Sequence, residues 1–341
     1  MDIGQEQPHR VLELWFEDAN VIFQAESSLF RVHKGILQAR SSVFRDMFAL
    51  PQATAPPESD LMDACIVIQL PDAAKDIRYF FLAIGYDASS VSVLFGCSFL
   101  RSYFCSSFFE PPPTPTSLSV ILAIARMSHK YDVPFLRRRA LSHLSHRCPT
   151  TLQDFITQYN HKALIILSEE LEVLKIALKI DTSWILPCQF LITYFTDLEA
   201  LLAHKAWKNL ELEIQAMCHV RWRRIETYSR SCIAELLRKL LSDLCTTCAV
   251  LGVQFQRAAV VALSKNIPNI ISPGFSTQTS ECCALCQRKI TEAIFNARGS
   301  FWDTLPETLG MPRWDVLETK KSEDTGANLI KVRFSLLLLT L

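Results

Sequence analysis

The chain has 341 residues, which is enough for about two domains. Hydrophobic residues make up 49% of it and charged residues 21%, a balance that excludes a chain disordered throughout. Lysine plus arginine equals aspartate plus glutamate at 35 each, so the net charge of zero offers no basic footprint for nucleic acid.

The N-terminus and the cysteines indicate a cellular compartment. Residues 1–9 are polar and acidic and contain no apolar core of a signal peptide. Twelve cysteines without such a signal fit a reducing compartment, where disulfides are rare. We therefore expect an intracellular protein, in the cytoplasm or the nucleus, with free thiols.

Residues 21–32 predict a β-hairpin. Val21, Phe23 and Ala25 alternate with polar or outward positions, and residues 29–32 form a second β-prone run. The connection, residues 26–28, is polar and short enough for a tight turn. A helical pattern follows, with an apolar stripe of Ile36, Leu37, Val43, Phe44, Met47 and Phe48. Two short strands that lead into helices predict a small α+β domain.

More elements of this domain follow in order. Residues 51–60 are a loop rich in proline and acidic residues, and residues 65–70 predict a short buried strand. Residues 108–116 contain four prolines and predict a stiff connection. Helices are expected over residues 73–84, from Leu118, and after a break at residues 129–136.

This order of elements resembles a BTB/POZ domain, most closely the versions in large fungal paralogue families. The matching residues are the hairpin, Phe30–Lys34, Leu37, the Ser41–Ser42 helix break and Phe44–Phe48. The resemblance implies an α+β fold in which helices cover a small sheet, over residues 10–148. It also implies protein binding, either as a homodimer or by docking of a protein partner.

His33 lies inside the matching run. A lone histidine at a strand-to-helix junction is expected to hydrogen-bond locally rather than to act as a base. The resemblance implies an acidic partner for this histidine near the start of the first strand. The equivalent position holds Asn20, with Asp18 two residues earlier.

Residues 91–107 depart from the resemblance and are interpreted as an atypical insert. Relatives run almost directly from a Tyr-Asp pair, here Tyr86–Asp87, into a Ser-Ser-Phe-Phe stretch, and here Ser89–Ser90 recurs as Ser106–Ser107 with the extra residues between them. The segment is apolar and aromatic, so a membrane helix has to be weighed. Arg101 lies near its middle, where it costs about 2.5–3.5 kcal/mol, and a crossing needs ~20 apolar residues. We expect a loop and no membrane segment.

Catalytic motifs are missing from the sequence. The nine glycines never take the spacing of a phosphate-binding loop, and no serine lies in a G-x-S-x-G turn. No H-E-x-x-H pair occurs among the eight histidines. We therefore expect no enzyme.

The second half, residues 151–320, is predicted to be mainly α-helical, and residues 321–341 an atypical or disordered tail. Leucines recur at helical spacing at 164, 167, 171, 174 and 178, and their simplest interpretation is core packing. The residues from 297 to 317 again resemble the fungal proteins. There Trp302 and Trp314 are interpreted as packing anchors.

Two C-x-x-C pairs are the one candidate for a chemical site: Cys245 with Cys248, and Cys283 with Cys286. Four thiolates in two such pairs can form the tetrahedral sulfur shell that zinc prefers. The other interpretation is that these cysteines pack as small apolar residues. A closed four-cysteine site would be structural, because no position stays open for a substrate.

We expect a non-enzymatic interaction protein, and the resemblance implies two roles for it. One is an adaptor for a cullin-type ubiquitin ligase, and the other is a subunit of a transcriptional regulator. The alternative is a zinc-dependent regulator that binds nucleic acid through the cysteine pairs. The neutral charge and the lack of a basic helix beside the cysteines disfavour nucleic acid as a partner.

Overall fold

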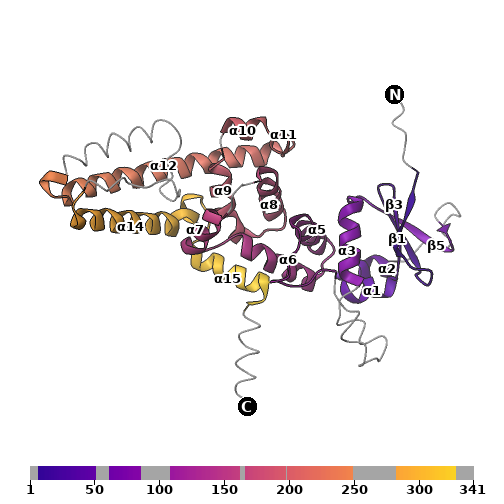
Figure 1. The fold of residues 1–341 in the computed structure, drawn as a ribbon. Helices are drawn as coiled ribbons and strands as arrows, with labels where there is room; N and C mark the ends of the chain where they lie inside the picture. Colours follow the sequence, from indigo (N-terminus) through magenta and orange to yellow (C-terminus); the bar gives the residue numbers. More distant parts are fainter. Residues whose placement is uncertain are drawn as a thin grey trace, which may run out of the picture. The chain divides into compact units, whose positions relative to one another are not determined.

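The computed structural model of the chain describes residues 7–50, 61–85, 108–161, 166–196, 198–248 and 282–327. Two compact units emerge from it: Met1–His146 with Asp324–Leu341 (unit 1), and Arg147–Glu323 (unit 2). Figure 1 traces the chain through both. The expected insert, residues 91–107, and residues 328–341 of the expected tail lie outside the described residues.

Unit 1 is an α+β domain, as expected. Its five-stranded sheet has the order β1-β3-β2-β5-β4. The strands are β1 His9–Trp15, β2 Val21–Ala25, β3 Ser28–Val32, β4 Leu61–Met62 and β5 Cys65–Leu70. Strand β2 pairs antiparallel with β3 and parallel with β5. The helices are α1 Lys34–Arg40, α2 Ser42–Ala49, α3 Ala74–Gly85, α5 Leu118–Lys130 and α6 Pro134–Arg147.

The predicted hairpin and helix break are both present. Ala25 pairs with Ser28, so Glu26 and Ser27 form a two-residue turn, with Glu26 at a φ of 50°. The apolar stripe that follows is divided at Ser41, whose hydroxyl accepts the Phe44 N–H at 3.0 Å. This cap starts α2 as a second helix, because it satisfies one of the free N–H groups of the first turn.

An aromatic cluster fills the space between the sheet and the helices. Phe23 of β2 packs on Phe44 of α2 and Phe81 of α3, with ring centroids 5.5 Å and 5.4 Å away. Tyr131 stacks on Phe44 at 4.7 Å and on Phe80 at 5.5 Å. All four phenylalanines are at most 2% exposed, so they form the centre of the core.

The opposite face of the sheet is also covered, which the alternation in β2 did not predict. Ile22, expected to point outward, is fully buried and packs with Leu29 and Cys65. Trp15, Met62 and Val67 lie against this cluster. Trp15 and Met62 belong to β1 and β4, two strands that the sequence patterns did not predict.

The chain leaves and re-enters the described part of unit 1 at nearby points, before and after residues 86–107. The ring of Tyr79 in α3 stacks on that of Phe108, with the centroids 5.9 Å apart. Tyr79 precedes the end of α3 at Gly85 by six residues, about 9 Å of helix. Without residues 91–107, residues 86–90 still span up to about 20 Å.

We therefore expect deletion of residues 91–107 to leave unit 1 folded and to reduce aggregation, because an apolar segment is removed. Hydrogen exchange of α3 and α5, compared with the full chain, measures the first effect and light scattering the second. Lost protection in both helices would show that the segment belongs to the core.

Unit 2 is mainly helical, as expected. Its elements are α7 Leu152–His161, α8 Leu167–Lys179, a 3₁₀ turn Ser183–Ile185, α9 Leu186–Tyr194, α10 Leu198–Ala203, α11 Lys205–Lys208, α12 Leu212–Asp243, α14 Ala284–Thr308 and α15 Trp314–Thr325. Helix α9 is buried along its whole length and carries a proline in its first turn, where the missing N–H costs nothing. Helix α15 continues to Thr325, into the range expected to be a tail.

Helices α12 and α14 form a long hairpin and lie side by side (Figure 1). Tryptophans attach one end of this hairpin to the rest of unit 2. The indole N–H of Trp222 donates to Thr193 of α9 at 3.2 Å, and that of Trp302 donates to the Thr150 carbonyl at 3.1 Å. Trp314 stacks on Trp302 at 5.2 Å, so both expected anchors do pack.

The described helices include none with the length and hydropathy that a bilayer crossing requires.

Candidate functional site

The outer strand of the sheet in unit 1 is β1, and no strand among the described residues pairs with its outer edge. Strand β1 comes first in the sheet order and pairs parallel with β3. Its register is irregular: Arg10 faces Leu29 and Trp15 faces Arg31, so five residue steps on β1 match two on β3. The residues between them cannot all follow the β3 ladder, and backbone groups of β1 remain for another strand.

The large apolar side chain that β1 exposes to solvent is that of Leu12, which is 84% exposed. The charged residues on either side of it have partners within unit 1. Arg10 pairs with Asp63 at 2.9 Å, and Glu13 pairs with Arg78 of α3. An exposed leucine between paired charges leaves an apolar centre on this edge.

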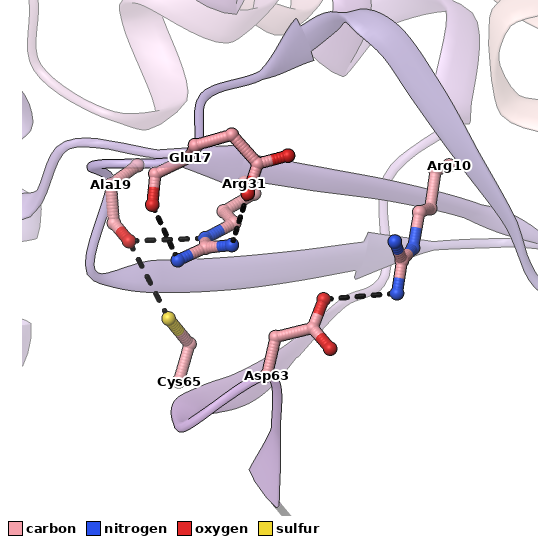
Figure 2. Close-up of polar contacts among 6 residues, drawn as sticks. All are labelled: Arg10, Glu17, Ala19, Arg31, Asp63 and Cys65. Atoms are coloured by element: carbon pink, nitrogen blue, oxygen red, sulfur yellow. Dashed lines mark hydrogen bonds and ion pairs between the residues drawn. The ribbon is translucent and has the colours of Figure 1, made fainter.

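Arg31 of β3 fixes the connection between β1 and β2 (Figure 2). Its guanidinium donates to the carbonyl oxygens of Glu17 at 2.7 Å and Ala19 at 3.1 Å. The thiol of Cys65 donates to the same Ala19 carbonyl at 3.5 Å. These hydrogen bonds from β3 and β5 fix the backbone at residues 17 and 19, and so fix the position at which β1 leaves the sheet edge.

His33 has an acidic partner, and that partner is Asp18. The two side chains lie 3.1 Å apart, and the hydrogen bond from His33 is the main reason that the pKa of Asp18 is lowered. Asn20 instead accepts the Lys34 N–H at 2.9 Å, at the start of α1. Asp18 is therefore the partner of the His33 side chain, and Asn20 is the acceptor for a backbone N–H in the first turn of α1. His33 thus makes the local contact expected of it.

The four predicted cysteines of unit 2 lie together. The Sγ atoms of Cys245, Cys248, Cys283 and Cys286 are all within 4.8 Å of one another. Cys248 and Cys286 are buried, and Cys245 and Cys283 are exposed. The cluster lies where α12 has ended and α14 begins, with Cys283 as the N-cap residue of α14. It therefore joins the two helices at the end of the hairpin opposite the tryptophans.

Backbone N–H groups are directed at the two buried sulfurs. The N–H of Cys245 donates to the Sγ of Cys286 at 3.5 Å, and the N–H of Cys283 donates to the Sγ of Cys248 at 3.4 Å. The first cysteine of each pair thus supports the second cysteine of the other pair. Such N–H groups stabilise the negative charge of a thiolate.

The thiol pKa values differ within each pair. The pKa of Cys245 falls to about 7, chiefly because of the backbone N–H of Cys248, and the backbone N–H of Cys286 lowers that of Cys283. The pKa of Cys248 rises to about 12, because the neighbouring thiols and burial outweigh the N–H of Cys283. Four adjacent thiols therefore do not all ionise without a compensating cation.

The surroundings of the cluster do not include the basic run of α12. Arg221, Arg223 and Arg224 precede the end of that helix by 19 residues or more, which is about 28 Å of helix. A cation does lie at this end of α12: the ammonium of Lys289 donates to the Asp243 carbonyl at 2.9 Å. Lys289 thereby satisfies a free carbonyl at the end of α12.

Residues 13–77 match the family model of the BTB/POZ domain. The chain contains a BTB/POZ domain. No curated protein and no solved structure gave a match. The matched residues begin at Glu13 in β1 and end at Ile77 in α3, so the BTB/POZ match includes the end of the edge strand, the whole hairpin, and Phe23 and Phe44 of the aromatic cluster. BTB/POZ domains are protein–protein interaction modules, and this one makes the chain a protein-binding protein.

Proposed function

We propose that the BTB/POZ domain binds a second copy of this chain and that the edge of β1 forms the contact. The exposed Leu12 between paired charges is the observation that carries the proposal. Unpaired backbone groups on β1 supply hydrogen bonds, and Leu12 supplies apolar area. A net charge of zero adds no overall repulsion between two copies.

Two-fold symmetry fits the length of this strand. Leu12 is the central residue of the seven in β1, His9–Trp15. If two copies of β1 pair antiparallel around a two-fold axis, Leu12 faces its own copy. Val11 then faces Glu13, and Arg10 faces Leu14, so no like charges are opposed. The contact is self-complementary, as a symmetric dimer requires.

Replacing Leu12 with aspartate is expected to weaken the dimer at least about tenfold, because two carboxylates then face each other. Leu12→Lys should do the same with two ammonium groups. A mixture of the two variants should form the heterodimer, because opposite charges then meet. Light scattering coupled to size-exclusion chromatography of the full chain measures each mass.

Leu212→Asp is the matched control, since Leu212 is 80% exposed and belongs to unit 2. Its dimer should resemble that of the unchanged chain. A full chain that is monomeric at high micromolar concentration would contradict self-association. Dimers of Leu12→Asp as stable as the unchanged ones would contradict the β1 contact.

The BTB/POZ resemblance supports two cellular roles for the assembled protein: an adaptor for a cullin-type ubiquitin ligase, or a subunit of a transcriptional regulator. Affinity purification of the full chain from its own cells distinguishes them. A cullin among the partners favours the adaptor, and chromatin proteins favour the regulator. The same cells, fractionated, place the protein in the cytoplasm or the nucleus.

A further inference from the structure

We propose that Cys245, Cys248, Cys283 and Cys286 bind one Zn²⁺ ion, which fastens the end of the α12–α14 hairpin. This site is separate from the dimer contact and does not depend on it. Zinc in this position would be structural, because four protein ligands complete its shell.

The distances fit the ion. Zinc lies about 2.3 Å from each thiolate sulfur in a tetrahedral site, so ligand sulfurs are about 3.8 Å apart. The four sulfurs here are already within 4.8 Å of one another. Contraction of the longest separation by about 1 Å would complete the shell, which side-chain rotation can supply.

The charges and hydrogen bonds fit it as well. Cys248 and Cys286 are 3% and 1% exposed, and a buried thiolate needs compensation by a cation or by donors. Each receives a backbone N–H from the opposite pair, as described above. Donors of this kind orient the ligands of a metal and lower the negative charge of a four-thiolate shell. Ordinary packing of apolar thiols does not require them.

The position of the cluster explains what the ion would do. From Trp222, α12 runs about 30 Å to its end, and Trp302 follows Cys286 by about 24 Å of helix. The two helices contact each other, and the buried apolar residues of this outer part are Ile233, Leu237, Leu240, Ile290 and Ile294, all at most 8% exposed. Two helices held by one apolar seam separate most easily at the unattached end.

An ion at that end would bind residues that are 35 positions apart in sequence, Cys248 and Cys283. The unfolded chain has no preformed site, so the binding free energy becomes folding free energy of the hairpin. Opening of the outer helices would then require loss of the metal. The surface of the hairpin would depend on zinc, while the BTB/POZ domain would not.

The test uses the full chain and measures metals by mass spectrometry. The expected content is about one zinc per chain, with Cys248→Ser and Cys283→Ser each losing it. Cys282→Ser is the matched control, because it lies next to Cys283 and is outside the cluster, so it should keep the ion. Iron in place of zinc, a chain without zinc, or zinc retained by both variants would overturn the proposal.

Hydrogen exchange shows whether the ion fastens the hairpin. Removal of zinc by a chelator should increase exchange over residues 233–248 and 284–294 at least about tenfold and leave β2 and α3 unchanged. Zinc added back should restore protection in the unchanged chain and in Cys282→Ser only. Exchange that is the same with and without the chelator would overturn the fastening role, even if the ion binds.

A cobalt titration covers the case in which a serine variant does not fold. The chelated, unchanged chain should take up one Co²⁺ with the absorption typical of tetrahedral thiolate ligands. Octahedral absorption, or no uptake, would overturn the four-cysteine shell without use of any variant.

Discussion

Replacing Phe44 with alanine is expected to lower the free energy of unfolding of unit 1 by about 3–5 kcal/mol. Phe44 is fully buried and contacts Phe23, Phe48, Phe80, Phe81 and Tyr131, with ring centroids from 4.7 to 6.5 Å away. Its ring therefore joins the sheet to α3 and to the end of α5. Alanine would leave a cavity with neighbours from three sides, and these neighbours cannot all move inward.

Hydrogen exchange of β2 and α3 in the full chain measures this effect, because unit 2 serves as the internal reference. A loss of 3 kcal/mol corresponds to a little more than a hundredfold faster exchange through unfolding. Phe108→Ala is the matched control: the ring of Phe108 is 38% exposed and stacks on Tyr79 alone among the described rings. It should cost about 1 kcal/mol or less.

Phe44→Leu should cost less than alanine does, since leucine keeps much of the volume. A change below tenfold for Phe44→Ala would show that the aromatic cluster collapses around the gap. In that case Phe44 would not be the centre of the core, and the stability of unit 1 would have to come from elsewhere in the domain.

The parts of the fold that the sequence predicts depend on neighbours in the chain. The β2–β3 hairpin needs only its alternation and its turn, and the break between α1 and α2 needs only the hydroxyl of Ser41. The cysteine cluster could also be predicted, because two C-x-x-C pairs each fix two thiols within a few residues. What spacing alone did not predict was their position at the end of a helical hairpin.

The parts that were missed depend on residues distant in sequence. The alternation of β2 predicts that Ile22 points to solvent. It is buried because residues distant in sequence, Trp15 and Met62, cover that face of the sheet. Strand β1 has an irregular register with β3, so it lacks the regular pattern of a paired strand. The acidic partner of His33 is Asp18, two residues before the expected position. That position holds Asn20, whose side chain accepts the Lys34 N–H at the start of α1.

The buried ion pair of unit 2 is another feature that no local pattern predicts. The guanidinium of Arg147 lies 2.7 Å from Glu170 and 2.9 Å from Glu169 of α8. Glu170 is 1% exposed, which is rare for a carboxylate unless a cation lies beside it. The two residues are 23 positions apart, so only the folded chain brings them together.

Replacing Arg147 with methionine is expected to destabilise unit 2 by about 3–5 kcal/mol, because the Glu170 carboxylate would stay buried without its guanidinium. Methionine keeps the apolar length of the side chain, so the loss would come from the charge. Five of the six tryptophans belong to unit 2, and their fluorescence during denaturant unfolding therefore reports this unit.

Lys320→Met is the matched control, since its partner Asp181 is 88% exposed and the pair lies in the same unit. It should cost less than about 1 kcal/mol. The double variant Arg147→Met with Glu170→Met should regain most of the lost stability, because no buried charge remains. A double variant as unstable as Arg147→Met alone would mean that the arginine acts through packing or through Glu169, and the buried carboxylate would not be the cause.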